Sequence, residues 1–246
     1  MDEFTGKATV YDKARPGYAP AALDFILGLL TPPCRCGDIP PRGGGQGRAV
    51  IADIGAGTGK FSSMLAERGY EVIAVEPNAD MRSRLPRTVR AVNGTAENTG
   101  LPDHCVDAVT CAQAFHWFDC EKFKAECGRI LRPGGRIFVV YNNPVGHERH
   151  DELIWHRKSD VPTRGWVERE ERLRDFFAPA MRREVFPNPV YYDAETWLAY
   201  MLSHSNSPRP DDEDYERFVE SVRLIFERNN EAGRLRMSFE TAVYTA

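Results

Sequence analysis

The residues most suited to chemistry lie in a glycine loop and in one acidic position downstream of it. An apolar run over 49–54 is followed at once by three alternating glycines, Gly55, Gly57 and Gly59. Glycine lacks a Cβ, so backbone N–H groups in such a loop can lie against a ligand and positive φ angles become accessible. A second apolar run over 71–76 ends in Glu76, about where nucleotide-binding βαβ units place the acid that binds both ribose hydroxyls.

The residues around the glycines discriminate between kinds of nucleotide. The dinucleotide pattern G-x-G-x-x-G needs a third small residue at position 60, where this chain has Lys60. The phosphate-binding pattern G-x-x-x-x-G-K-[ST] also fails, because Ile54 replaces its first glycine and Phe61 replaces its Ser or Thr. A G-x-G-x-G loop preceded by Asp53 suits an adenosine ligand with an amino-acid tail and no phosphates. We therefore expect S-adenosylmethionine in this site.

Four further segments occur in the order typical of one enzyme family. They are 8–18, 94–102, 107–118 and 132–141. With the glycine loop and Glu76 they make the chain resemble the class I S-adenosylmethionine-dependent methyltransferases, specifically the small-molecule branch that includes trans-aconitate methyltransferase-like proteins. The resemblance covers most of the chain and is loose over 144–182. It implies an α/β fold with a Rossmann-like, seven-stranded, mostly parallel sheet and a small helical lid.

The resemblance also implies which residues contact the cofactor and the methyl acceptor. The expected cofactor-binding residues are Tyr11, Arg15, Asp53, Gly55, Ala56, Gly57, Gly59, Glu76, Pro77, Met81, Thr95, Ala96, Glu97, Gln113 and Ala114. The expected substrate-pocket residues are Tyr18, Phe115, His116 and Trp117. Many relatives have an Asp where Thr95 stands, so backbone atoms of Ala96 and Glu97 are the alternative partners of the adenine amine.

Methyl transfer from a sulfonium asks little of the protein beyond alignment of the nucleophile with the methyl carbon and the sulfur. A general base is needed when the acceptor arrives protonated, whereas a carboxylate acceptor needs none. His116 is the candidate base; its alternative role is to shape the pocket. Trp117 could present its ring to the sulfonium, a contact of about 1–2 kcal/mol, or anchor the core. Arg15 could bind a carboxylate or stiffen the turn before the first helix.

The hydrophobic pattern alternates strands with helices, which predicts a parallel sheet with ligands at the carboxyl ends of its strands. Asp119 is a plausible N-cap for the helix that follows it. The resemblance further implies that two late strands close the sheet as an antiparallel pair. The expected strands are 49–54, 71–76, 88–93, 106–111, 137–141, 184–192 and 235–244; the expected helices are 20–30, 59–68, 79–85, 119–131, 194–203 and 212–229.

We interpret the chain as one domain with four parts. These are a lid segment, helix and flexible loop (1–48), a cofactor-binding core (49–143), a helical cap with the sixth strand (144–234) and the last strand (235–246). The stretch 147–175 is dense in charge and is expected to form solvated helices over the sheet edge. The aromatic residues Tyr191, Tyr192, Trp197 and Tyr200 are expected mainly in the core, with one or two at the acceptor site.

Composition excludes several partners. A net charge of −4 with interspersed signs gives no basic face for nucleic acid. No signal region or membrane-spanning apolar run is evident, so a cytoplasmic protein is expected. Cys34 and Cys36 lack the partner cluster of a zinc site, and no metal is expected. The expected partner is a small-molecule acceptor; a protein or RNA methyltransferase, an NAD-binding oxidoreductase and a non-catalytic cofactor-binding regulator are the alternatives.

Overall fold

The computed structural model describes residues 15–30, 49–145, 163–204 and 207–246, with no side-chain description over 163–167. The expectations for Tyr11, Cys34, Cys36 and most of the N-terminal lid and loop lie outside the described residues. In the described part no helix is long and apolar enough to cross a membrane.

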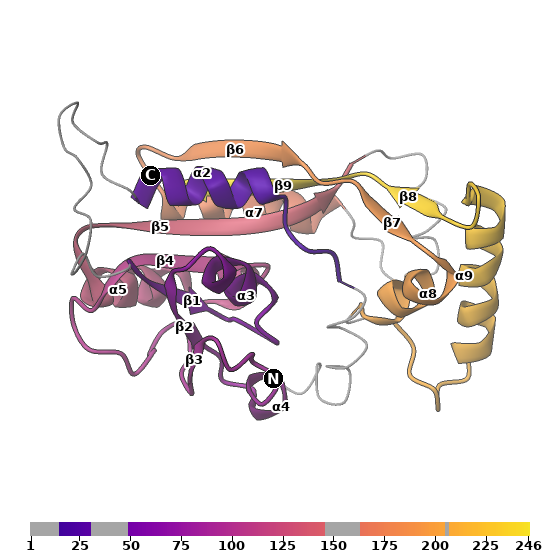
Figure 1. Ribbon diagram of the computed structural model, residues 1–246, viewed down its shortest axis with the longest axis horizontal. Coiled ribbons are helices and arrows are strands. Elements are labelled where there is room, and N and C mark those ends of the chain that lie inside the picture. Colours follow the sequence, from indigo (N-terminus) through magenta and orange to yellow (C-terminus); the bar gives the residue numbers. More distant parts are fainter. Residues whose placement is uncertain (1–14, 31–48, 146–162, 205–206) are drawn as a thin grey trace.

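A seven-stranded sheet forms the centre of the fold, in the order β3-β2-β1-β4-β5-β9-β6 (Figure 1). The first five strands of that order are mutually parallel, and β9 runs antiparallel to both of its neighbours. This confirms the predicted α/β class, the mostly parallel sheet and the antiparallel closing pair. The strands are β1 (Val50–Ile54), β2 (Glu71–Val75), β3 (Arg90–Val92), β4 (Val106–Ala112), β5 (Leu131–Pro144), β6 (Arg182–Pro187) and β9 (Phe239–Thr245).

Helices cover both faces of the sheet because its strands bury apolar side chains on both sides. One core cluster joins α2 (Pro20–Leu30) and α3 (Lys60–Glu67) to the sheet. The other joins it to α5 (Cys120–Ile130) and α7 (Thr163–Phe176). Two short helices, α4 (Ala79–Arg82) and the 3₁₀ helix η1 (Phe115–Trp117), follow β2 and β4.

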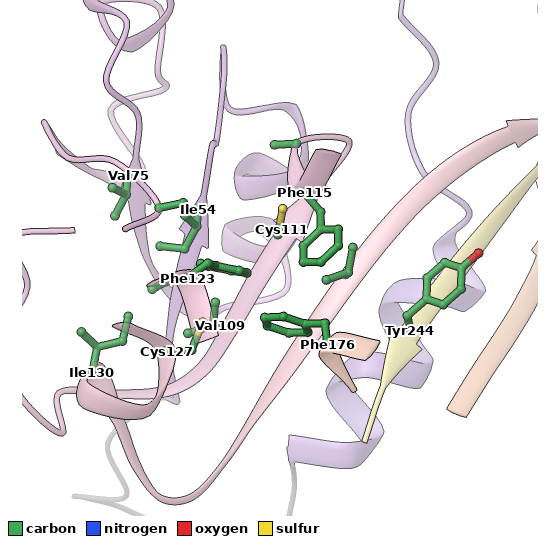
Figure 2. Close-up of a cluster of buried hydrophobic side chains, with 14 of the residues drawn as sticks. Ile54, Val75, Val109, Cys111, Phe115, Phe123, Cys127, Ile130, Phe176 and Tyr244 are labelled. Atoms are coloured by element: carbon green, nitrogen blue, oxygen red, sulfur yellow. The ribbon is translucent and has the colours of Figure 1, made fainter. Parts of the chain in front are cut away.

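The cluster under α5 and α7 is rich in aromatic rings (Figure 2). The ring of Phe176 lies 5.1 Å from that of Phe115 and 5.5 Å from that of Phe123. Leu173 is fully buried beside them. The prediction of solvated helices at the sheet edge was therefore wrong for α7, which packs on a face. Its apolar residues are few, but their helical spacing places them on one side.

Both late strands are shorter than predicted, because each divides into two. β6 ends at Pro187, and the chain then forms β7 (Val190–Tyr192). Pro187 and Pro189 have no backbone N–H to donate, which interrupts a continuous ladder. β7 pairs with β8 (Leu235–Met237) in a separate two-stranded sheet, and β9 begins only at Phe239.

β7 and β8 carry α8 (Ala194–Leu202) and α9 (Tyr215–Asn229), and these four elements form a small lobe with its own core. The lobe lies beyond the end toward which β5 runs (Figure 1). Trp197 is almost fully buried in it, and its indole N–H donates to the Val222 carbonyl at 3.1 Å. Asp193 caps α8 through the Thr196 backbone N–H at 2.8 Å.

Other boundaries shift by a few residues. α4 ends three residues earlier than predicted, whereas the prediction for α2 is confirmed. β5 begins at Leu131 instead of 137, because Leu131 pairs with Val106 ahead of the turn that contains Gly134 (φ 81°). Asp119 caps α5 as predicted, accepting from the Lys122 backbone N–H at 3.2 Å.

Candidate active site

The three loop glycines all adopt positive φ angles, 69° at Gly55, 59° at Gly57 and 87° at Gly59, but they have different neighbours. A Cβ on Gly55 would lie 2.7 Å from the Ala114 Cβ, and one on Gly59 would lie 2.7 Å from Leu85 Cδ2. A Cβ on Gly57 would meet no atom of the described residues within 4 Å. Gly55 and Gly59 are thus required by packing, and Gly57 leaves space for a ligand.

Glu76, at the end of β2, holds the loop. Its Oε2 accepts from the Gly57 backbone N–H at 2.8 Å, and its Oε1 accepts from the Asn78 N–H at 2.9 Å. The residue is 8% exposed. A carboxylate offers about four acceptor sites, so each oxygen keeps capacity for one further donor. The fixed carboxylate can therefore bind two neighbouring hydroxyls, as a ribose presents.

Arg82, which was not predicted as a site residue, holds the turn after Glu76. Its guanidinium donates to the carbonyls of Glu76 at 2.8 Å and of Pro77 at 2.9 Å. Asn78 caps α4, and Met81 is buried beneath the turn. The predicted cofactor residues Pro77 and Met81 thus lie beside Glu76, where their contact with the cofactor stays a prediction.

Asp53 connects three elements beneath the glycine loop. Its carboxylate accepts from Ser62 Oγ at 2.5 Å and from Thr110 Oγ1 at 2.9 Å, which joins β1 to α3 and β4. The residue is 1% exposed. Burial raises its pKa to about 6, against the lowering effect of the two hydroxyls. The geometry gives Asp53 a positioning role; its direct contact with a cofactor stays a prediction.

The loop after β3 is fixed by Glu126 of α5. Glu126 Oε1 accepts from Thr99 N at 2.8 Å and from Thr99 Oγ1 at 2.6 Å. Hydrogen bonding to Arg129 lowers the Glu126 pKa to about 2 despite its burial, so the pair is ionised at neutral pH. A Cβ on Gly94 would lie 2.4 Å from the Thr99 carbonyl oxygen, which explains the glycine.

The side chains of Thr95 and Glu97 in this loop already have partners. Thr95 Oγ1 accepts from Asn98 N at 3.2 Å, and Glu97 Oε1 accepts from Asp119 N at 3.0 Å. Ala96 is buried. Contact of the Ala96 or Glu97 backbone with the adenine stays a prediction.

His116, in η1 after β4, pairs with Tyr141 of β5 through an Nδ1–Oη distance of 3.3 Å. One side of the imidazole is open to solvent, whereas Tyr141 covers the Nδ1 side and is itself buried. Loss of water lowers the His116 pKa to about 4, and the charges of Arg169 and Arg172 lower it further. The ring is therefore neutral at pH 7, and its lowered pKa makes it a weaker base than an ordinary histidine.

Arg169 and Arg172 come from α7, which the sequence analysis did not connect to the site. The Arg169 guanidinium lies 4.1 Å from the Tyr141 ring centroid. Arg172 donates to the His116 carbonyl at 3.2 Å and to the Phe118 carbonyl at 2.7 Å. Their i, i+3 spacing in a charged helix was the available signal, but it is common on solvated helices as well.

The other predicted residues after β4 separate into different environments. Gln113 has φ 58°, unusual for a residue with a side chain, and its amide donates to the Asn142 carbonyl at 3.0 Å. Trp117 is 56% exposed beside His116, which rules out a core anchor. Phe115 is fully buried in the aromatic cluster, as Figure 2 shows, so we correct its placement from substrate pocket to core.

The N-terminal segment, residues 15–19, crosses from the glycine loop to the small lobe. The Lys60 ammonium donates to the Arg15 carbonyl at 2.5 Å, and the Arg15 guanidinium donates to the Ser203 carbonyl at 3.3 Å. Tyr18 is buried and packs edge-on against Phe61, at 4.9 Å between ring centroids. Lys60, whose presence argued against a dinucleotide, thus holds this segment in place.

Comparisons with known proteins agree with this geometry. Residues 52–139 match the family model described as a methyltransferase domain, the stretch that contains the glycine loop, Glu76 and His116. Residues 52–139 form a methyltransferase domain. This domain includes strands β2, β3 and β4 and the loops at their carboxyl ends.

Two curated relatives of the methyltransferase domain show how far the likeness extends. An uncharacterized methyltransferase of Mycobacterium tuberculosis is 40% identical over 159 residues, covering 63% of this chain and 56% of the relative. An uncharacterized methyltransferase of Schizosaccharomyces pombe is 29% identical over 214 residues, covering 84% and 80% respectively. The chain thus spans little more than half the length of the first relative.

Two solved structures share the fold. A candidate type II methyltransferase from Anaeromyxobacter dehalogenans has a TM-score of 0.64 at 24% identity, covering 94% of this chain and 97% of that one. A candidate methyltransferase from an antibiotic biosynthesis pathway of Anabaena variabilis has a TM-score of 0.60 at 24% identity, covering 95% and 99%. At this identity the likeness concerns the fold alone. Among the described residues no group of three His, Cys, Asp or Glu side chains could hold a metal ion.

The burial of Asp53 predicts a specific pH dependence of stability. The folded carboxyl keeps its proton up to about pH 6, whereas its ordinary pKa is 3.8. Between these values the folded state binds more protons, so raising the pH destabilises it by about 3 kcal/mol in total. Asp53→Asn has no carboxyl at this position, so its stability lacks this dependence on pH. Urea unfolding at pH 4 and pH 7 should show the variant gaining about that much relative to wild type, and a pH-independent difference would contradict the assignment.

Proposed function

We propose that this protein transfers the methyl group of S-adenosylmethionine to an oxygen of a small-molecule acceptor, as the trans-aconitate methyltransferase-like branch does. The observation that carries the proposal is the Glu76 carboxylate, held by the Gly57 N–H at 2.8 Å beside the space that Gly57 leaves. When bound, S-adenosylmethionine supplies an electrophilic methyl group on a sulfonium.

The residues present fit such a cofactor. Glu76 keeps acceptor capacity on both oxygens for the two ribose hydroxyls. Thr95 Oγ1 and Glu97 Oε1 each accept a hydrogen bond within the protein, and we assign the adenine amine to the backbone of Ala96 and Glu97. Lys60 holds the N-terminal segment at the position where a dinucleotide site needs a small residue. These features favour an adenosine ligand without a pyrophosphate.

The chain's own contribution to the reaction is orientation and, for some acceptors, removal of a proton. Gln113, tied to the Asn142 carbonyl, fixes the end of β4 against β5. This places His116 and the exposed Trp117 at the carboxyl end of the sheet, next to the glycine loop. The neutral imidazole of His116 can accept a hydroxyl proton, whereas a carboxylate acceptor has no proton to lose.

The small-molecule acceptor is supported by the N-terminal segment and the charge. This segment bonds to Lys60 directly after the glycine loop and to Ser203 of the small lobe, and we propose that it covers a small acceptor between them. The net charge of −4 disfavours RNA.

The glycine loop gives the first test. Gly57→Ala should weaken binding of S-adenosylhomocysteine at least tenfold in calorimetry, because the methyl group enters the space beside Glu76. Gly69→Ala is the matched control: Gly69 also has a positive φ (87°), and its Cβ also meets no described atom within 4 Å, but it lies at the far end of α3. Both variants share the backbone strain, so equal affinities in the two would remove Gly57 from the site.

His116 gives the second test, with acceptors taken from a metabolite library incubated with isotope-labelled methyl donor. His116→Gln should lower the single-turnover rate on a hydroxyl acceptor about 10²–10⁴-fold and leave a carboxylate acceptor nearly unchanged. Because the pKa of His116 is lowered, the wild-type rate on a hydroxyl should fall only as the pH approaches about 4. An equal loss on both acceptor types would show that His116 shapes the pocket and is not a base.

A further inference from the structure

One polar atom of the small lobe has no hydrogen-bond partner among the described residues: the hydroxyl of Tyr192, at the end of β7. The residue is 3% exposed, so water does not satisfy the hydroxyl from the surface. Leaving a buried hydroxyl unpaired is unfavourable, and such atoms are rare in folded proteins. A group absent from the free protein is therefore the natural partner of this donor.

The surroundings of this hydroxyl define the chemistry of that partner. The Tyr192 ring stacks on Tyr200 of α8 at 5.0 Å, and the Arg15 guanidinium lies 5.9 Å from the Tyr200 ring centroid. Arg15 acts electrostatically on Tyr192, and its charge is positive. Burial raises the pKa of the phenol above its ordinary value, so the hydroxyl keeps its proton and remains a donor. A phenol O–H donor within the field of a positive guanidinium suits an anion.

The position links this donor to the methyl-transfer site. Arg15 donates to the Ser203 carbonyl at the end of α8, while its own carbonyl accepts from Lys60 directly after the glycine loop. The phenol thus lies where the N-terminal segment passes from the cofactor loop to the small lobe. Asn142 and Asn188 fix this passage, donating to the Gly17 carbonyl at 2.9 and 2.8 Å.

We propose that Tyr192 and Arg15 form a carboxylate subsite for the methyl acceptor, at the junction of the N-terminal segment and the small lobe. The phenol donates one hydrogen bond to the carboxylate, and the guanidinium supplies the opposite charge. The inference rests on the proposed function, which it deepens by naming an acidic acceptor. The subsite orients the acceptor through a group on the lobe side and requires no covalent step.

The carboxylate probe is trifluoroacetate, followed by ¹⁹F NMR, with trifluoroacetamide as the uncharged probe of similar shape. Calorimetry first confirms that S-adenosylhomocysteine binds; its failure to bind would overturn the proposed function itself. With S-adenosylhomocysteine bound, wild type should bind trifluoroacetate saturably and trifluoroacetamide at least tenfold more weakly. Tyr192→Phe should weaken trifluoroacetate about tenfold, the scale of one charge-assisted hydrogen bond.

Tyr191→Phe is the matched control, since Tyr191 is the preceding residue of β7 and is 54% exposed. It should bind the probe as wild type does. Equal trifluoroacetate affinity in Tyr192→Phe and wild type, or no saturable binding to either, would overturn the subsite. Trifluoroacetate binding that is seen in the free protein and lost when S-adenosylhomocysteine is added would assign the subsite to the cofactor's own carboxylate and overturn its role toward the acceptor.

The stability of the free protein gives a second readout that does not depend on any ligand. Tyr192→Phe removes a hydroxyl that has no partner, so the urea midpoint of the free variant should equal or exceed that of wild type. A lower midpoint would show that the hydroxyl has a structural partner in the free protein, and this would overturn the inference.

Discussion

The hydrogen bond from the Gly57 N–H to the Glu76 carboxylate joins the ends of two neighbouring parallel strands, and the rest of the site is arranged around it. It requires a positive φ at Gly57 and a buried carboxylate at the end of β2. Arg82 donates to the Glu76 carbonyl in the turn after β2, and Asp53 joins β1 to α3 at the start of the glycine loop. A carboxylate immobilised in this way does not need to be ordered when a ligand arrives, which conserves binding free energy.

The same edge of the sheet collects the remaining groups because parallel strands all end on one side. β4 delivers Gln113 and η1, while β5 delivers Tyr141 and Asn142. Asn142 connects the loop after β4 to the N-terminal segment. Its carbonyl accepts from Gln113, and its side chain donates to the Gly17 carbonyl. Thr241 of β9 completes this network with a 2.6 Å hydrogen bond to Asn142 Oδ1. The antiparallel strand therefore stabilises the site as well as closing the sheet.

Local signals were enough to predict the centre of the fold. The alternation of apolar runs, glycine loop and amphipathic segments gave the parallel strands, and the cap at Asp119 was readable from residue type. The acid at the end of β2 and the loop glycines were likewise predictable. The different roles of the three glycines, two in packing and one beside open space, were not. Gly55 and Gly59 are set by contacts with Ala114 and Leu85, which are distant in sequence.

What could not be predicted depends on long-range packing. Most residues of α7 are charged or polar, and only a few apolar residues on one side of the helix are buried. Its packing on a sheet face and the contacts of Arg169 and Arg172 were therefore not predicted. The aromatic pattern over 184–192 looked continuous, although two prolines divide it between two sheets. Phe115 was assigned to the pocket through the family resemblance of the segment 107–118, whereas η1 turns its ring into the core.

The binding of S-adenosylhomocysteine to a pair of variants of β2, measured by calorimetry, tests the central claim most directly. In Glu76→Gln the amide nitrogen cannot accept from the Gly57 or Asn78 N–H, so one of these bonds is lost together with the charge. Glu71→Gln makes the same change at the exposed, opposite end of the strand. The account predicts a loss of at least tenfold in affinity for Glu76→Gln, about 1.5–3 kcal/mol, and less than twofold for Glu71→Gln. Wild-type affinity in Glu76→Gln would contradict it.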